Sequence, residues 1–132
     1  MDIQFRADNT YSILEIIGLY DSAGLNRPTQ DMERIADMYR HSNLVITAWD
    51  GALLVGVARS VTDFYYSCYL SDLAVRKEYQ RQGIGRQLVL QTKEMIGDRC
   101  MLLLLATPSA IEYYPKIGME TVNNGFIIKR TL

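Results

Sequence analysis

The sequence predicts an α/β domain: a central mixed sheet with a parallel strand-helix-strand core and flanking helices. Three observations support this prediction. Residues 70–75 are mostly apolar, residues 84–95 have helical apolar spacing, and residues 100–106 form an apolar run without alternation. Because such a run suits a strand covered on both faces, and a strand-helix-strand order favours parallel pairing, we expect residues 100–106 to form a central strand.

The N-terminal part predicts one strand and two helices. Ile3 and Phe5 alternate with polar neighbours, which indicates a short first strand. Asn9 or Thr10 is expected to cap a helix that ends at Gly24. A second helix is expected from Thr29. Its buried stripe would consist of Met32, Ile35, Ala36 and Tyr39.

A hairpin is predicted next. Asp50 and Gly51 separate the β-prone residues 44–49 and 52–61, and Asp-Gly favours a tight turn. Gly56 indicates a bulge or a close backbone approach. The aromatic residues that follow line an acceptor pocket or, more commonly for such residues, pack in the core. They are Phe64, Tyr65, Tyr66 and Tyr69.

The C-terminal third predicts helix, strand, short helix and strand. The helix after the glycines would face inward at Ile84, Leu88 and Met95. Thr107 and Pro108 would open a helical piece at residues 109–114, which Pro115 kinks or ends. After an Asn-Asn-Gly turn, residues 126–130 would form the last strand.

Size and composition indicate one ordinary domain spanning residues 1–132. The chain has 132 residues, 48% of them hydrophobic and 22% charged, with a formal net charge of -1. This balance speaks against nucleic-acid or membrane-surface binding. With no apolar leader and no run long enough to span a bilayer, a cytoplasmic location is expected. Cys68, Cys100 and His41 lack metal-ligand spacing, so no metal is expected, and both cysteines should be reduced and buried.

A basic turn with two glycines, residues 76–85, joins the strand at 70–75 to the following helix. The stretch from residue 76 to residue 86 has one acidic residue, Glu78, and four basic ones: Arg76, Lys77, Arg81 and Arg86. A turn of this kind presents free backbone N–H groups and a helix N-terminus to an anion, which predicts a phosphorylated cofactor. Two common phosphate motifs do not fit: Leu88 stands where a dinucleotide fingerprint needs its third glycine, and no Gly-Lys-Ser/Thr string occurs.

The turn does match the pattern Gln/Arg-x-x-Gly-x-Gly/Ala, at Gln80, Gly83 and Gly85. It is preceded by Asp-Leu-Ala-Val at residues 72–75 and followed by Ala-x-x-Tyr-Tyr-x-Lys-x-Gly-Met at residues 110–119. Together these motifs resemble the GNAT superfamily of acetyl-CoA-dependent N-acetyltransferases. The resemblance implies a GNAT-like fold and acetyl-CoA as co-substrate.

The resemblance also implies how coenzyme A is held. Backbone amides of residues 81–86 would hold the pyrophosphate, since a side chain at either glycine would keep it off the backbone. The two core strands would splay and admit the pantetheine arm, with the Leu73 amide at the oxyanion. Thr107 stands where many members carry an asparagine beside pantetheine. The implied cofactor-binding set is Leu73, Val75, Gln80, Arg81, Gln82, Gly83, Ile84, Gly85, Arg86, Thr107 and Tyr114.

Two residues are candidates for proton transfer. Tyr114 matches the family tyrosine that protonates the leaving thiolate, although it could instead be a packed aromatic residue next to Tyr113, which matches a buried family phenylalanine. Asp72 is the only acid inside its strand, where it could act as base, bind a cationic acceptor or cap an amide. A water chain is the other option for the base.

The predicted function is therefore N-acetyl transfer from acetyl-CoA to a primary amine of a small molecule or peptide. A non-catalytic acyl-CoA sensor is the alternative, and protein acetylation is a third hypothesis. Loops at residues 21–30 and 63–67 should shape the acceptor site, and their tyrosines hint at an aromatic or cationic amine. The resemblance leaves a homodimer through the late strands open.

Overall fold

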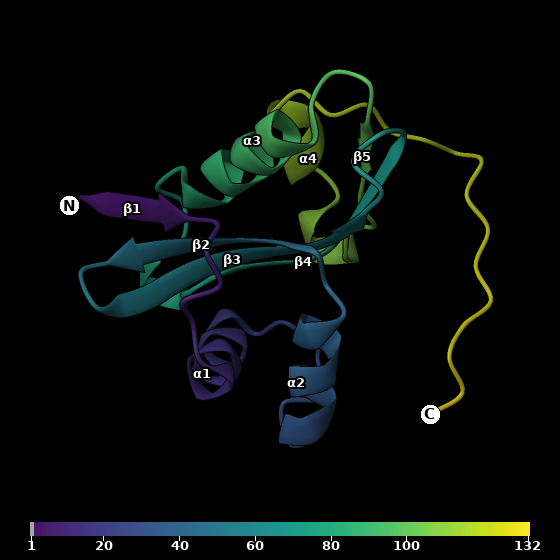
Figure 1. Ribbon diagram of the computed structural model, residues 1–132. Coiled ribbons are helices and arrows are strands. Elements are labelled where there is room, and N and C mark those ends of the chain that lie inside the picture. Colours follow the sequence, from purple (N-terminus) through teal and green to yellow (C-terminus); the bar gives the residue numbers. More distant parts are fainter. Residues whose placement is uncertain (1) are drawn as a thin grey trace.

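The computed structural model describes residues 2–132 as one five-stranded sheet with helices on both faces (Figure 1). The strands are β1 (Ile3–Arg6), β2 (Leu44–Asp50), β3 (Leu53–Thr62), β4 (Ser67–Val75) and β5 (Met101–Leu103). The α-helices are α1 (Ile13–Ala23), α2 (Met32–Arg40), α3 (Ile84–Ile96) and α4 (Tyr113–Lys116), with two short 3₁₀ turns, η1 (Lys77–Tyr79) and η2 (Pro108–Ala110).

The strands follow one another across the sheet in chain order. The first four pair antiparallel, and β4 pairs parallel with β5. The predicted parallel unit is therefore confirmed as β4-α3-β5. The hairpin between β2 and β3 is also confirmed, and Gly51 at its turn has φ of 58°, a conformation that glycine adopts without cost.

Two layers of helix enclose the sheet. Helices α1 and α2 cover one face, and α3 and α4 lie over the other (Figure 1). On the α1 and α2 side, the largest buried side chains are Ile16, Leu19, Tyr20 and Ile35. Two predicted core positions are wrong: Met32 and Met95 are about half exposed. Each lies at the margin of its helix stripe, where a flexible thioether side chain reaches solvent at little cost.

The first helix begins two to three residues later than predicted. Ser12 is its N-cap: the Ser12 Oγ accepts from the Glu15 amide (3.1 Å), and the Ser12 amide donates to the Glu15 carboxylate (2.9 Å). This reciprocal pair satisfies two end groups at once, an advantage that neither Asn9 nor Thr10 has. The predicted end at Gly24 is confirmed, with φ of 73°.

Helix α3 lies directly on the backbone of β3 at Gly56. A methyl group added there would stand 3.0 Å from the Leu88 Cδ1 and 3.3 Å from the Ile84 Cγ2. The close approach predicted for this glycine is therefore confirmed. It fixes how near the start of α3 comes to the sheet.

The apolar run at residues 100–106 does not form a central strand. Only three of its residues pair, as β5, and β5 is the last strand of the sheet. The prediction fails because, within residues 2–132, no later segment pairs with its outer edge. Pro115 likewise does not end a helix but lies inside the single turn of α4, where its missing N–H is not needed.

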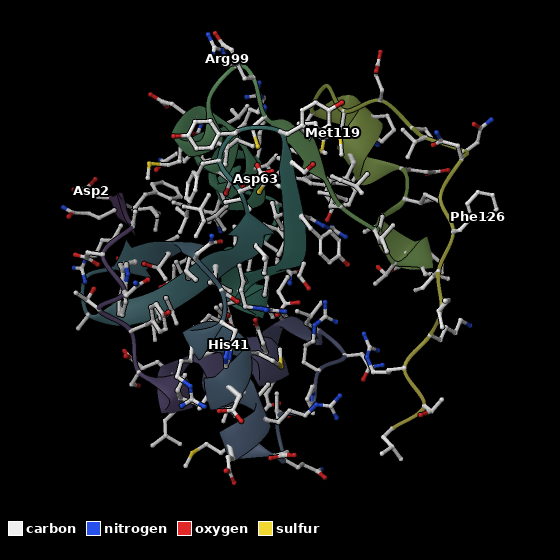
Figure 2. The ribbon with its side chains drawn as sticks, turned by 45° about the vertical axis from the view of Figure 1, so that its right-hand side comes forward. Asp2, His41, Asp63, Arg99, Met119 and Phe126 are labelled. Carbon is white, nitrogen blue, oxygen red and sulfur yellow. The ribbon has the colours of Figure 1, made fainter. Side chains whose placement is uncertain are left out.

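The predicted last strand at residues 126–130 is also wrong. From residue 119 onward the chain runs extended beside the protein without pairing to the sheet (Figure 1). Phe126 is 99% exposed and points away from the protein body (Figure 2). The sequence pattern is that of a strand, but a strand also has to pair with a neighbouring edge, and among the residues described this segment pairs with none.

A membrane-spanning helix and a cluster of metal ligands are both absent from the residues described. None of the helices in residues 2–132 has the length and apolar character that a membrane span requires. Within the same residues, no three His, Cys, Asp or Glu side chains are grouped to hold a metal ion. Both cysteines are free and buried, as predicted.

Candidate active site

The glycine turn lies between η1 and α3, and its backbone is unusual at two positions. Arg81 and Gly83 both have positive φ, 65° and 86°. Among the turn and cap hydrogen bonds of residues 2–132, none is donated by the amides of residues 81–86; the first of α3 runs from the Gln87 amide to the Gly83 carbonyl (3.1 Å). These six amides are therefore free to bind an anion.

The other members of the predicted cofactor set lie around this turn in different ways. Gln80 is exposed, and its Nε2 donates to the Val75 carbonyl (2.9 Å), which connects the turn to the end of β4. The Ile84 side chain is buried against the sheet, so only its backbone can serve a ligand. The side chains of Arg81, Gln82 and Arg86 are exposed.

The two glycines of the motif differ in their surroundings. A methyl group at Gly83 would meet nothing within 4 Å, whereas one at Gly85 would lie 3.3 Å from the Tyr113 hydroxyl. Tyr113 therefore stands beside the start of α3 and is 38% exposed, not buried as the family resemblance implies. The sequence motif gave no sign of this contact.

The two core strands separate towards their C-terminal ends. Pairing between β4 and β5 covers only residues 67–69 and 101–103, while β4 continues to Val75. Beyond Tyr69 and Leu103, that side of β4 has no strand partner within the residues described. This gap has the form that a pantetheine arm would need to enter as an added strand.

A cavity of about 100 Å³ opens where this pairing ends. It brings together three predicted site residues, Leu73, Thr107 and Tyr114, which come from β4, the loop after β5 and α4. The rest of the wall consists of Leu25, Arg27, Leu70, Ser71, Leu104, Leu105 and Ala110. The residues predicted to supply the acid and the oxyanion donor thus line one small cavity.

Tyr114 is only partly exposed in this cavity. Burial, with a smaller contribution from the neighbouring Tyr113, raises the pKa of the Tyr114 phenol above its ordinary value. The two rings meet edge to face with centroids 5.2 Å apart. A phenol with a raised pKa keeps its proton at neutral pH, which is the state that a general acid requires.

Asp72 occupies a different environment from the one expected of a base. Its carboxylate is fully buried and accepts hydrogen bonds from the Tyr20 hydroxyl (2.6 Å), the Arg27 Nε (2.7 Å) and the Arg59 Nε (2.8 Å). Burial alone would raise the pKa of Asp72, but the hydrogen bond and charge of Arg59, then Tyr20 and Arg27, outweigh it and lower the pKa. The geometry therefore favours a structural role for Asp72.

A β-bulge lies in β4 next to Asp72. Arg59 pairs with Asp72 and Ser60 with Leu70, which leaves Ser71 as an extra residue on β4. The Ser71 carbonyl accepts from the Arg27 Nη2 (2.9 Å), and its hydroxyl accepts from the Arg59 Nη2 (3.0 Å). Neither arginine belongs to a recognisable motif, and sequence reasoning missed both.

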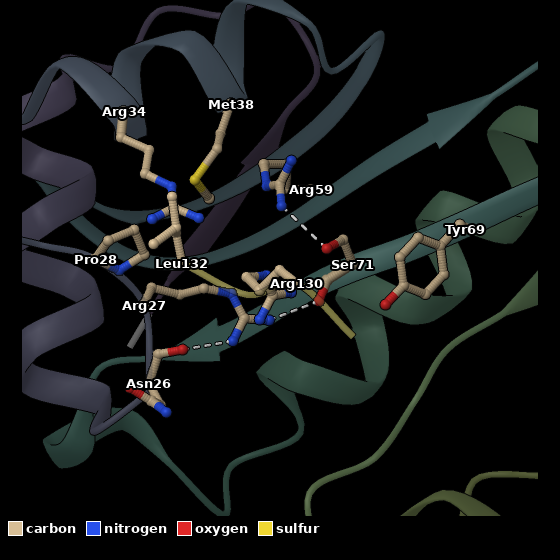
Figure 3. Close-up of a pocket in the computed structure, with 10 residues that line it drawn as sticks. All are labelled: Asn26, Arg27, Pro28, Arg34, Met38, Arg59, Tyr69, Ser71, Arg130 and Leu132. Carbon is tan, nitrogen blue, oxygen red and sulfur yellow. Dashed lines mark hydrogen bonds between the residues drawn. The ribbon is translucent and has the colours of Figure 1, made fainter. Parts of the chain in front are cut away.

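A larger cavity of about 440 Å³ adjoins the first (Figure 3). The two share Arg27 and Ser71 in their walls. The larger cavity is lined by Asn26, Arg27, Pro28, Arg34, Met38, Arg59, Tyr69, Ser71, Arg130 and Leu132. Four of these ten residues are arginines.

The predicted acceptor loops contribute unequally to this cavity. Residues 21–30 supply Asn26, Arg27 and Pro28, whereas residues 63–67 supply none of its wall. Of the four aromatic residues noted in the sequence, only Tyr69 lines the cavity. Tyr65 and Tyr66 are more than 70% exposed, so neither the pocket nor the packing interpretation holds for them.

Comparisons with known proteins agree on one family. The model of the acetyltransferase (GNAT) domain matches residues 41–120. The chain is 23% identical to the N-acetyltransferase ycf52 of Pyropia yezoensis, over 89% of this chain and 70% of that protein. It is 30% identical to the N-acetyltransferase YvbK of Bacillus subtilis, over 81% of this chain and 56% of YvbK.

Solved structures with the same fold include a GNAT-family acetyltransferase from Streptococcus pneumoniae. That chain superposes with a TM-score of 0.81 at 25% identity, with 99% of this chain and 100% of that chain covered. The aminoglycoside N-acetyltransferase AAC(6')-Iy in complex with CoA superposes with a TM-score of 0.75 at 13% identity, with 99% and 96% covered. The latter likeness concerns the fold alone.

Proposed function

The chain belongs to the GNAT family of acetyltransferases, and we propose that it transfers an acetyl group from acetyl-CoA to a primary amine by direct attack. The observation that carries this proposal is the small cavity between the separated ends of β4 and β5. There Leu73, Thr107 and Tyr114 lie together next to a second cavity large enough for an acceptor. The acceptor is a small molecule or a peptide amine.

Coenzyme A is proposed to bind along the gap between β4 and β5, with its pyrophosphate on the amides of residues 81–86. Their freedom from internal hydrogen bonds supports this placement. Gln80 would act by holding the turn to the Val75 carbonyl. The CoA complex of a protein with the same fold, AAC(6')-Iy, supports acetyl-CoA as co-substrate.

The acetyl group is proposed to lie in the smaller cavity. As the amine attacks the thioester carbonyl, the oxygen gains negative charge, and the Leu73 amide would donate a hydrogen bond to it. When the C–S bond breaks, the departing thiolate would take the proton of the Tyr114 hydroxyl. The attacking nitrogen loses its extra proton to water, and the Tyr114 phenolate takes a proton back from solvent, so the products are an amide and a free thiol.

Replacing Tyr114 with phenylalanine tests the proposed acid. We expect Tyr114→Phe to lower kcat by about 10² to 10⁴, because the leaving thiolate then lacks a positioned proton donor. The KM for acetyl-CoA should stay within a factor of about two to three, a change below ~1 kcal/mol. Thiol release from acetyl-CoA is the measurement, and the neighbouring Tyr113→Phe variant is the control.

The same assay separates transfer from mere binding. Acetyl-CoA that binds without thiol release for every amine tested, together with no loss of binding in Tyr114→Phe, would indicate an acyl-CoA sensor instead.

No protein base is proposed, because Asp72 is buried and committed to two arginines. The acceptor would lose its proton to solvent, so kcat/KM should rise with pH as an alkylammonium of pKa near ~10 deprotonates. Since the pKa of Tyr114 is raised, the acid should not limit the rate in that range. A pH profile that instead falls between about 7 and 9 would contradict this assignment.

We further propose a homodimer in which the extended C-terminal segment of one chain pairs with the β5 edge of another. Both parts are unsatisfied within one chain: β5 ends the sheet, and Phe126, Ile127, Ile128 and Leu132 are mostly or fully exposed. An unpaired edge and an apolar strand-like segment favour such exchange. Light scattering should give a dimer mass that Phe126→Ser with Ile128→Ser reduces; a monomer of the unaltered protein would refute it.

A further inference from the structure

The larger cavity carries a positive charge that the proposed transfer chemistry does not use. Four guanidinium groups line it, and among the residues described no aspartate or glutamate does. We propose that this cavity holds an anionic group of the acceptor, so that the substrate is a small amine that also bears a carboxylate or phosphate. This inference rests on the proposed acetyl transfer and narrows its substrate class.

Two of the arginines are already fixed in place. Arg27 donates through Nε to Asp72, through Nη1 to the Asn26 carbonyl and through Nη2 to the Ser71 carbonyl. Arg59 donates to Asp72, to the Ser42 hydroxyl and to the Ser71 hydroxyl. One carboxylate therefore faces two guanidinium groups, which leaves a net positive charge in a rigid wall of the cavity.

Two of the four arginines, Arg130 and Arg34, make no side-chain hydrogen bond or ion pair among the residues described, and the one that a helix holds in place is Arg34. It lies in the first turn of α2, where its backbone amide donates to the N-cap Asp31. Its side chain reaches the cavity together with Arg27 and Arg59 (Figure 3). In residues 2–132 its guanidinium makes no hydrogen bond or ion pair with the protein. A planar fork without a partner, beside two fixed positive groups, is suited to bind a carboxylate or phosphate in bidentate fashion.

The position of the cavity relates the anion to the reacting amine. Because Arg27 and Ser71 line both cavities, we expect a short chain of atoms in the acceptor to connect an anion near Arg34 with an amine at the proposed acetyl site. The favoured acceptor thus has only a few bonds between its amine and its anionic group. A polycation is disfavoured, since it would meet several guanidinium groups and no aspartate or glutamate side chain in the wall described.

The first experiment compares amines that differ only in the anionic group. β-Alanine against propylamine tests a carboxylate, O-phosphoethanolamine against ethanolamine tests a phosphate, and spermidine tests a polycation. We expect kcat/KM for at least one anionic member to exceed that of its neutral partner by about 10- to 100-fold, the range of one charge-assisted hydrogen-bond pair. The arm with the larger ratio identifies the anion.

The second experiment removes the available guanidinium. Arg34→Gln should raise KM for the anionic amine by about 10-fold or more, with kcat and the KM for acetyl-CoA unchanged. Arg34→Lys should recover part of the loss. The control is Arg99→Gln. Arg99 is exposed, lines neither cavity and lies in the connection from α3 to β5, on the opposite side of the protein from the end of α2 at His41 (Figure 2).

The outcomes separate the two proposals. If thiol is released but propylamine or spermidine is as good as both anionic amines, the anion site is refuted and acetyl transfer stands. If no amine releases thiol, the proposed function fails, and calorimetric titration of O-phosphoethanolamine and β-alanine into the CoA-loaded protein decides the anion site alone. Binding that Arg34→Gln weakens about 10-fold supports it; equal binding, or none, overturns it.

Discussion

The glycine turn and the arginine cavity are both suited to negative charge, but they are built in opposite ways. The turn, residues 80–86, offers backbone amides, and its shape depends on positive φ at Arg81 and Gly83. The cavity offers guanidinium groups from distant segments, two of which are held by the buried carboxylate of Asp72. Changes of backbone conformation should therefore damage the turn, and changes of charge should damage the cavity.

The largest effect is expected where the cavity depends on one charge. Asp72→Asn should lower the free energy of unfolding by about 3–5 kcal/mol, because it leaves two arginines in a buried site without their counter-charge. Urea unfolding measures this loss. Asp21→Asn, at an exposed carboxylate on α1, is the control and should change stability by less than about 0.5 kcal/mol.

The same residue predicts a pH dependence. Because the folded pKa of Asp72 lies below its ordinary value, its stabilising contribution is fully present above the unfolded pKa of about 3.9. That contribution is lost as the pH falls through the folded pKa. The unaltered protein should lose stability more steeply than Asp72→Asn below about pH 4; parallel curves would show that folding does not lower the pKa of Asp72.

An intermediate effect is expected at the turn. Gly83→Ala should cost about 1–2 kcal/mol, since the left-handed conformation strains any residue with a Cβ, and should raise the KM for acetyl-CoA. Gly97→Ala is a matched control at the other end of α3, also with positive φ. It should cost at least as much stability without changing that KM, because Gly97 has ψ of -178°, a conformation that residues with a Cβ avoid. If both variants change the KM equally, the turn has no special part in binding the cofactor.

The smallest effect is expected where the sheet supports the turn. Gly56→Ala should destabilise the protein by about 1 kcal/mol, because the added methyl presses on the Leu88 and Ile84 side chains. Flexible side-chain ends can move by a few tenths of an ångström, which keeps the cost low. We expect the KM for acetyl-CoA to stay unchanged. If it rises as stability falls, the contact between α3 and β3 also determines the conformation of the glycine turn.

The same contrast explains what could be predicted from the sequence. The turn is local, so its glycines, its strand and its helix follow one another in the chain and could be predicted. The cavity is not local: Arg27, Arg59 and Asp72 meet only because the β4 bulge at Ser71 and the α1 to α2 loop bring them together. The sequence shows Asp72 as the single acid in β4, but its hydrogen-bond partners Tyr20, Arg27 and Arg59 could not be predicted from it.

The errors in the fold have a similar cause. Residues 100–106 have the composition of a central strand and residues 126–130 that of a strand, but composition does not determine which edges pair. The first segment forms only the edge strand β5, and the second pairs with no strand among the residues described. Tyr114 was placed by its motif alone. Its position beside Leu73 depends on α4, where Pro115 is tolerated because it stands in the first turn.

The arginines of the larger cavity differ in whether they also stabilise the fold. Arg27 and Arg59 cannot be exchanged without releasing Asp72, but the Arg34 side chain on α2 holds nothing else in the protein. A small mutant library at position 34, joined with position 69, could thus retune acceptor choice while leaving the scaffold intact. For enzyme engineering, the cavity-facing side of the nine-residue helix α2 is therefore where substitutions should change acceptor selectivity with the least effect on folding.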